Sequence, residues 1–134
     1  MNITQHFTLE EFEKSEAATK FKLDNSMPAR YYKNLERLCE HVLEPLRAHL
    51  QCPIVISSGY RCEGLNQLVK GSENSQHRIG CAADFTCEKM NIAIDIFKGK
   101  YLKYDQCIVH DTFIHISYNN HVCNRNQFID LRKK

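Results

Sequence analysis

The feature that most constrains the fold is a ten-residue stretch in the middle of the chain, residues 75–84, with the sequence SQHRIGCAAD. Gly80 predicts a turn, and the residues after it alternate as they do in a β-strand, so residues 81–87 are expected to form a strand. Alternation along this strand places Asp84 on one definite face. The stretch therefore predicts a loop that carries His77 next to a strand that carries Asp84.

Patterns before this stretch predict both helices and a strand. Thr8 and Glu11 fit a capping box, in which each side chain accepts a hydrogen bond from a backbone amide at the start of a helix. Apolar positions three or four residues apart predict a longer helix over residues 32–46, which Pro45 bends or interrupts. The run at residues 53–58 is short and β-branched, which is typical of a buried strand.

The remaining segments complete a mixed set of elements. Further helices are expected at residues 65–69 and 88–97, and further strands at residues 106–109 and 113–118. A polar corner at His110 and Asp111 separates the last two strands, so they are expected to pair as a hairpin. Helices interspersed with neighbouring strands predict an α+β domain, built on a mainly antiparallel sheet with flanking helices.

Length and composition restrict the class of protein. A chain of 134 residues has room for one hydrophobic core, so residues 1–134 are expected to form a single domain. With 43% apolar and 25% charged residues, the chain resembles ordinary soluble globular proteins. The formal net charge is only +2 and the basic residues are scattered, which argues against nucleic acid as a partner.

The sequence has none of the apolar segments that direct a protein to or through a membrane. No stretch approaches the roughly 18 consecutive apolar residues of a membrane span. The N-terminal part lacks the basic start and apolar core of a secretory signal. We therefore expect a cytoplasmic protein as encoded, without a membrane span, which would act on a cell wall only after export by another route.

The cysteine pattern also agrees with a cytoplasmic protein. There are seven, an odd number, and no two of them have CxxC spacing. This pattern predicts reduced thiols. Structural zinc sites bring their ligands in closely spaced pairs, so dispersed cysteines argue against a four-thiolate zinc site. No pattern in the sequence indicates an oligomeric state.

His77, Asp84 and a distant histidine form a candidate metal site. A catalytic zinc site takes three protein ligands at about 2.0–2.3 Å and leaves another position to water. His115 is the natural third ligand, because an unpaired imidazole among its apolar neighbours would be costly to bury. The residues alone leave other interpretations open: His115 as a hydrogen-bonded core residue, His77 as a solvated side chain, and Asp84 as an acceptor of backbone hydrogen bonds.

The same residues resemble a known family signature. Residues 75–84 match all five fixed positions of the SxHxxGxAxD signature of the D-alanyl-D-alanine carboxypeptidase and dipeptidase family, peptidase family M15. The resemblance extends over roughly residues 7–125. Four further segments resemble family motifs in the family's order: FTLEEF at residues 7–12, ISSGYR followed by LN at 56–66, YDQ at 104–106 and FIHIS at 113–117.

This resemblance implies a fold shared with the zinc-binding domain of hedgehog signalling proteins, with Zn²⁺ held by His77, Asp84 and His115. It also implies that Arg61 and Ser75 contact the substrate. A guanidinium stays charged and donates two parallel hydrogen bonds, which suits a peptide carboxylate or a carbonyl oxyanion. The expected substrate is the peptide part of peptidoglycan, cut by D,D-carboxypeptidase or endopeptidase action, and the chain resembles short phage or prophage members of the family.

The identity of the catalytic base is where the chain departs from the family. The resemblance implies metal-assisted hydrolysis, in which a base takes the proton of the attacking water. Many relatives place Asp or Glu three residues before the last histidine ligand, where this chain has Thr112. Some close relatives carry an acid after FDQ, where this chain has His110 followed by Asp111. Three alternatives stay open: the base is His110, it is Asp111, or it is neither of them.

This departure keeps two other classes of function open. One is a catalytically silent zinc module that binds a peptide or protein partner, as hedgehog domains do. The other is a cytosolic binding protein without a metal, which the presence of the whole predicted ligand set disfavours. Metal content separates the second class from the rest, and turnover separates the peptidase from the silent module.

Overall fold

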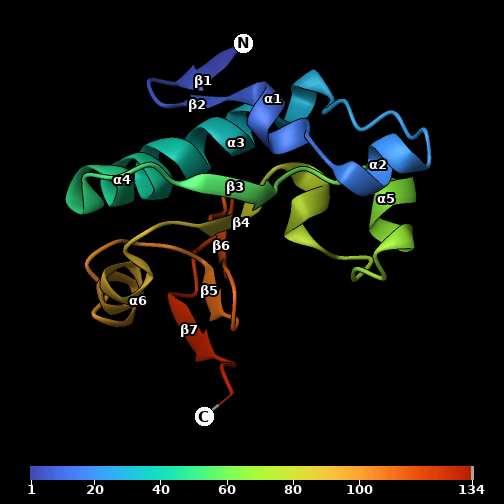
Figure 1. The fold of residues 1–134 in the computed structure, drawn as a ribbon. Coiled ribbons are helices and arrows are strands. Elements are labelled where there is room, and N and C mark those ends of the chain that lie inside the picture. The colour runs from blue at the N-terminus through green and yellow to red at the C-terminus, as the bar shows by residue number, and fades with distance from the viewer. Residues whose placement is uncertain (134) are drawn as a thin grey trace.

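A five-stranded sheet runs through the centre of the molecule (Figure 1). The computed structural model describes residues 1–133. The sheet has the strand order β3–β4–β6–β5–β7, and its members are β3 (Val55–Ser58), β4 (Ala82–Thr86), β5 (Gln106–Val109), β6 (Ile114–Ser117) and β7 (Gln127–Asp130). A separate two-stranded sheet pairs β1 (Asn2–Thr4) with β2 (Phe7–Thr8).

Helices flank the central sheet. The α-helices are α1 (Leu9–Glu13), α2 (Glu16–Lys20), α3 (Tyr32–Leu38), α4 (Glu44–Leu50), α5 (Glu63–Leu68) and α6 (Met90–Lys98). Shorter helical turns are η1 (Ala29–Tyr31), the π-turn η2 (Cys39–Leu43) and the 3₁₀-helix η3 (Gln76–Ile79). Figure 1 shows α3 and α4 running along β3, with α6 and α5 well separated on either side of the sheet. No helix within residues 1–133 is both long and apolar enough to cross a bilayer.

Antiparallel pairing dominates the central sheet. β4 pairs with β3 and β6, and β5 pairs with β6, all antiparallel, whereas β7 runs parallel to β5. The predicted α+β fold, with a mainly antiparallel sheet and flanking helices, is therefore confirmed, as is the hairpin of β5 and β6. The sequence did not predict β7, because its four residues contain only Phe128 and Ile129 as strand-favouring apolar positions.

The two faces of the central strands differ in polarity. Phe85 of β4 and Ile114 and Ile116 of β6 are fully buried in the main hydrophobic core, to which α3, η2, α4 and α6 also contribute. Because side chains alternate along a strand, Asp84 and His115 belong to the opposite face. The apolar face thus fixes the orientation of the polar one.

Two local predictions about helices are confirmed. The Thr8 hydroxyl accepts a hydrogen bond from the Glu11 amide, and the Glu11 carboxylate accepts one from the Thr8 amide at 2.6 Å, so the capping box begins α1. The long helix is interrupted just before Pro45, where η2 widens it and the Glu44 amide bonds to the carbonyl of Cys39. A widened turn relieves the clash between a proline ring and the carbonyl four residues earlier.

The prediction of a buried strand at residues 53–58 is wrong in one respect. A strand forms there, but β3 lies at the edge of the sheet and pairs only with β4 among the described strands. Val55 is 57% exposed, whereas Ile56 packs against the core. A β-branched composition is as suitable for a half-buried edge strand as for a buried one, so composition alone does not distinguish them.

Candidate metal centre

The three predicted metal ligands come from three adjoining elements. His77 lies on η3, whose first turn is capped by the Ser75 hydroxyl accepting a hydrogen bond from the His77 amide at 3.2 Å. Gly80 ends η3 with a φ of +77°, which glycine adopts without strain, and leads the chain directly into β4. Asp84 of β4 and His115 of β6 are direct partners in the antiparallel register, so their side chains lie side by side.

The ligand atoms of these three side chains converge. The Nε2 atom of His77 lies 3.3 Å from Oδ1 of Asp84, and the Nδ1 atom of His115 lies 2.9 Å from the same oxygen. All three potential ligand atoms lie within 4.8 Å of one another. The structure therefore brings together the whole His-Asp-His set, from residues up to 38 positions apart in the sequence.

The hydrogen bonding of His77 leaves one ring nitrogen for a metal. Its Nδ1 atom lies 2.7 Å from the carbonyl oxygen of Gly59, which can only accept, so Nδ1 carries the proton and neutral Nε2 presents a lone pair. Nε2 is buried and has no hydrogen-bond donor. Gly59 is required here, because a Cβ atom would lie 2.6 Å from the backbone of Phe12.

This arrangement fits a divalent cation. A buried lone pair on His77 facing a carboxylate oxygen at 3.3 Å is unfavourable unless a proton or cation lies between them. Two imidazole nitrogens and one carboxylate oxygen are the donors that zinc takes in catalytic sites. The carbonyl of Gly59 supplies the outer-shell partner that fixes the tautomer of a ligating histidine.

The carboxylate at the centre of the cluster is ionised. Burial alone would raise the pKa of Asp84, but the contacts of its carboxylate with the His115 and His77 rings outweigh it and hold the pKa well below its ordinary value. The guanidinium of Arg61 adds a more distant positive charge, with Nη2 at 3.8 Å from Oδ2 of Asp84. An ionised carboxylate is the form that binds a metal.

An open cavity of about 820 Å³ surrounds the cluster. Arg61 and Ser75, predicted to contact the substrate, both line it. Arg61 is half-buried: its amide donates to the His77 carbonyl at 3.1 Å, and its Nη1 donates to Oδ1 of the buried Asn66 at 3.3 Å. Burial lowers the pKa of Arg61, while Asp84 partly opposes this shift. The backbone and Asn66 thus hold the guanidinium beside the metal ligands.

The two candidate bases occupy different surroundings. His110, at the corner between β5 and β6, lines the cavity and stacks on Phe113 with ring centroids 4.4 Å apart. Asp111 is exposed, and its carboxylate accepts a hydrogen bond from the Lys133 amide at 2.9 Å. Of the two, only His110 belongs to the cavity lining.

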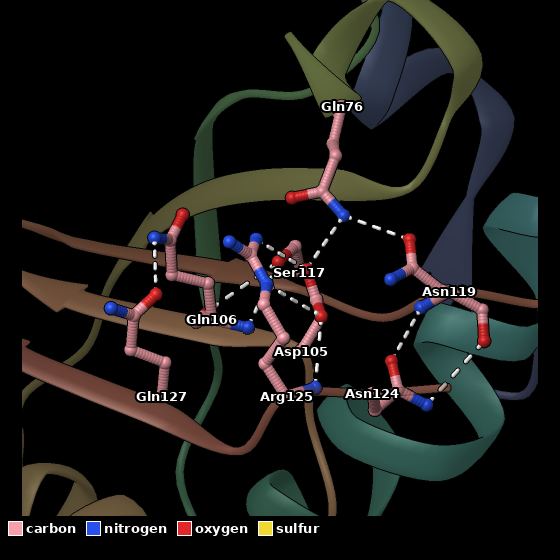
Figure 2. A network of polar contacts seen from close by, with 8 residues as sticks. All are labelled: Gln76, Asp105, Gln106, Ser117, Asn119, Asn124, Arg125 and Gln127. Atoms are coloured by element: carbon pink, nitrogen blue, oxygen red, sulfur yellow. Dashed lines mark hydrogen bonds and ion pairs between the residues drawn. The ribbon is translucent and has the colours of Figure 1, made fainter. Parts of the chain in front are cut away.

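A polar network beside the cavity was not assigned a role from the sequence. Figure 2 shows the guanidinium of Arg125 facing Asp105, while Gln76 donates both to Asp105 and to Asn119. Asp105 belongs to the YDQ segment, which marked it as a family position without indicating its partners. Gln76 is a variable position of the signature, and Arg125 lies beyond the last matched motif, so no sequence pattern indicated a role for either.

Comparison with known proteins agrees with this geometry. A family model described as Peptidase M15 matches residues 5–117, which is most of the chain. No curated protein matches the chain. The matched range contains all three predicted ligands as well as Arg61 and His110. The chain therefore belongs to the peptidase M15 family of metallopeptidases.

Proposed function

We propose that the protein is a zinc-dependent peptidase that hydrolyses the peptide part of peptidoglycan, as a D,D-carboxypeptidase or an endopeptidase. The observation that carries this proposal is the buried Nε2 atom of His77, which has no hydrogen-bond donor and faces Asp84 and His115 in an open cavity. Membership of a metallopeptidase family supports peptide hydrolysis as the chemistry of this cavity.

His77, Asp84 and His115 would hold the zinc ion through Nε2, a carboxylate oxygen and Nδ1. When bound, zinc supplies Lewis acidity, which polarises a carbonyl oxygen and lowers the pKa of a water molecule toward about 7. Three protein ligands leave a position for water or substrate, as a catalytic site requires.

His110 is the proposed general base. Its position in the cavity lining supports this role, since a base must be within reach of the water that it deprotonates. It would accept a proton from the attacking water and return it to the leaving amine. Thr112 cannot act in this way, and the contact of Asp111 with Lys133 directs its carboxylate to another group.

Arg61 and Ser75 are the proposed substrate contacts. Arg61 keeps its charge beside the ligand cluster, so it can donate to the carbonyl oxygen that becomes negative in the transition state or to a terminal carboxylate. The Ser75 oxygen accepts from the His77 amide, which leaves its hydroxyl proton for a peptide carbonyl. We further propose that a cytoplasmic protein of this kind reaches the wall by another export route.

A second candidate function is a catalytically silent zinc module that binds a peptide. The cavity lining favours it in one respect: among residues 1–133, the carboxylates that line the cavity are Asp84 and Asp105. Asp84 belongs to the proposed ligand set, and Asp105 is occupied by Arg125. Neither carboxylate in that lining is therefore available to serve as the general base.

The deciding experiment is mass spectrometry of purified peptidoglycan peptides incubated with zinc-loaded protein. Release of D-alanine from pentapeptides indicates a carboxypeptidase, and cleavage of cross-linked dimers indicates an endopeptidase. Both products should disappear on treatment with a chelator and in His115→Ala. Stoichiometric zinc without any cleavage would overturn the peptidase proposal in favour of the silent module.

A further inference from the structure

Asp105 lines the cavity, but no step of the proposed hydrolysis uses it. Its side chain is 1% exposed and accepts four hydrogen bonds. Oδ1 accepts from the amide and Nε of Arg125 at 3.0 and 3.1 Å, and Oδ2 accepts from Nη2 of Arg125 at 2.7 Å and from Nε2 of Gln76 at 3.0 Å. A buried carboxylate with this many donors is strongly held in one geometry.

The partners of Asp105 come from three parts of the site (Figure 2). Gln76 precedes the proposed ligand His77 on η3. The Asp105 amide donates to the carbonyl of Ser117 at 2.8 Å, two residues after the proposed ligand His115. Arg125 ends the segment that follows β6. Asp105 therefore joins the elements that carry two proposed metal ligands to a segment that carries none.

That segment, residues 119–125, forms part of the cavity boundary. Gln76 Nε2 donates to Oδ1 of Asn119 at 2.8 Å, and the Asn119 amide donates to Oδ1 of Asn124 at 2.7 Å, which closes the segment on itself. Between these anchors, Val122 lines the cavity and is 66% exposed. The segment thus presents an apolar side chain toward whatever occupies the cavity.

We infer that Asp105 is a positioning residue that fixes residues 119–125 as a wall of the substrate cavity, on which Val122 faces the substrate. This inference rests on the proposed peptidase function. Positioning the wall affects how the substrate is bound more than how the bond is broken, because the wall holds none of the proposed catalytic groups. Loosening it should therefore raise KM more than it lowers kcat.

The chain contains a matched control for this ion pair. Arg132 donates to Asp130 through Nε at 3.0 Å and Nη2 at 2.7 Å, the same two-pronged geometry that Arg125 makes with Asp105. Asp130 lies at the end of β7 and is not part of the cavity lining. Asp130→Asn removes the same charge from a more exposed pair of the same geometry, outside the proposed wall.

The test compares Asp105→Asn with Asp130→Asn in zinc-loaded full-length protein. In Asp105→Asn, a neutral amide replaces a carboxylate that accepts only, so one of the facing donors of Arg125 or Gln76 loses its acceptor. We expect KM for a peptidoglycan pentapeptide to rise about tenfold, the size of effect expected for a lost charged hydrogen bond, with bound zinc unchanged. Asp130→Asn should leave KM and zinc at wild-type values.

Hydrogen exchange gives a readout that is independent of turnover. The amides of Asn119 and Arg125 are bonded to Asn124 and Asp105, so Asp105→Asn should exchange them faster than wild type, whereas Asp130→Asn should not. Arg125→Ala provides a second variant if Asp105→Asn does not fold, because the Arg125 side chain is largely exposed. Arg125→Lys, which keeps the charge without the fork, should restore part of the loss.

The outcomes separate this inference from the proposed function. Unchanged KM and unchanged exchange in both Asp105→Asn and Arg125→Ala, with zinc retained, would overturn the positioning role. A fall in kcat alone would also overturn it. If wild-type protein binds the pentapeptide without cleaving it, the peptidase proposal fails, and the exchange rates with the dissociation constant for the pentapeptide decide the inference in the same directions.

Discussion

Two histidine–carboxylate clusters in this molecule have similar distances and different surroundings. At the surface, His6 Nδ1 lies 2.6 Å from Oε1 of Glu44, and the His6 amide donates to Oε2 at 2.8 Å, so one histidine satisfies one carboxylate. In the cavity, His77 and His115 both approach Oδ1 of Asp84, at 3.3 and 2.9 Å. We call His6 and Glu44 the outer pair, and His77, Asp84 and His115 the inner cluster. In the outer pair one ring contacts one carboxylate, whereas in the inner cluster two rings contact the same carboxylate oxygen.

The two sites differ in the partners that are available to the histidine ring nitrogens. The side chains of His6 and Glu44 are 34% and 20% exposed, so water can solvate whatever the pair leaves unbonded. His77 is 4% exposed, and its Nδ1 is already committed to Gly59, which turns its remaining lone pair toward Asp84. Short histidine–carboxylate distances therefore do not define a metal site; the inner site is distinguished by two rings that converge on one carboxylate and by an outer-shell partner that fixes one of the rings.

Substituting one side chain in each of the two sites should give the largest contrast in zinc affinity. Asp84→Asn is expected to lower zinc affinity by more than the roughly 10–100-fold that loss of an outer-shell partner costs, because it removes a ligand charge. Cleavage should be lost with the metal. Zinc content by mass spectrometry and affinity by competition with a chelator measure this. His6→Ala is the control and should bind zinc as wild type does; equal zinc loss in both variants would break the distinction between the clusters.

The proposed base should produce the next effect. His110→Gln keeps a polar side chain of similar size at the cavity but cannot take a proton at neutral pH. General-base removal typically costs about 10²–10⁴-fold in rate, so kcat should fall by that range while bound zinc stays at one per chain. His49→Gln, at an exposed histidine of α4 outside the cavity lining, is the control. An unchanged kcat would assign proton transfer to another group.

Arg61 is expected to follow, because it acts on the substrate and not on the metal. Arg61→Lys keeps a charge but cannot donate two parallel hydrogen bonds. Loss of one donor to a developing oxyanion costs about 10²–10³-fold in kcat, and we expect an effect of that size with zinc retained. Arg37→Lys, at an exposed pair with Glu40, should leave kcat unchanged. Loss of zinc in Arg61→Lys would indicate that Arg61 instead supports the ligand cluster.

The sequence pattern predicted the His77–Asp84 part of the inner cluster because that part of its geometry is set locally. His77 and Asp84 are separated by one turn, and alternation fixed the side on which Asp84 lies. The pairing of Asp84 with His115 depends on the register of β4 and β6, which the sequence pattern did not establish; the family resemblance indicated it. Asp105 and Arg125 were not linked, because their contact depends on how residues 119–125 fold back, and no periodicity records that.

Asp105 should also contribute to stability in a pH-dependent way. Burial would raise its pKa, but the hydrogen bonds and charge of Arg125 lower it overall, so the folded state favours the ionised form. This contribution is present above the ordinary aspartate pKa and is lost as the pH falls through the lowered folded value. Asp105→Asn should cost about 1.5–3 kcal/mol of unfolding free energy at pH 7 and less at pH 3, measured by urea unfolding. An equal cost at both pH values would contradict this assignment.

The outer pair should give the smallest effect. Burial would raise the pKa of Glu44, but neighbouring donors, among them His6, lower it overall, so its contribution is present at neutral pH and is lost in acid. Because both side chains are partly exposed, Glu44→Gln should cost less than about 1 kcal/mol at pH 7, and less still at high salt. Urea unfolding at two salt concentrations measures this. Zinc affinity and cleavage should stay at wild-type values, because hydrogen bonds from His6 satisfy the Glu44 carboxylate without a metal. A change in either would mean that the outer pair is coupled to the inner cluster.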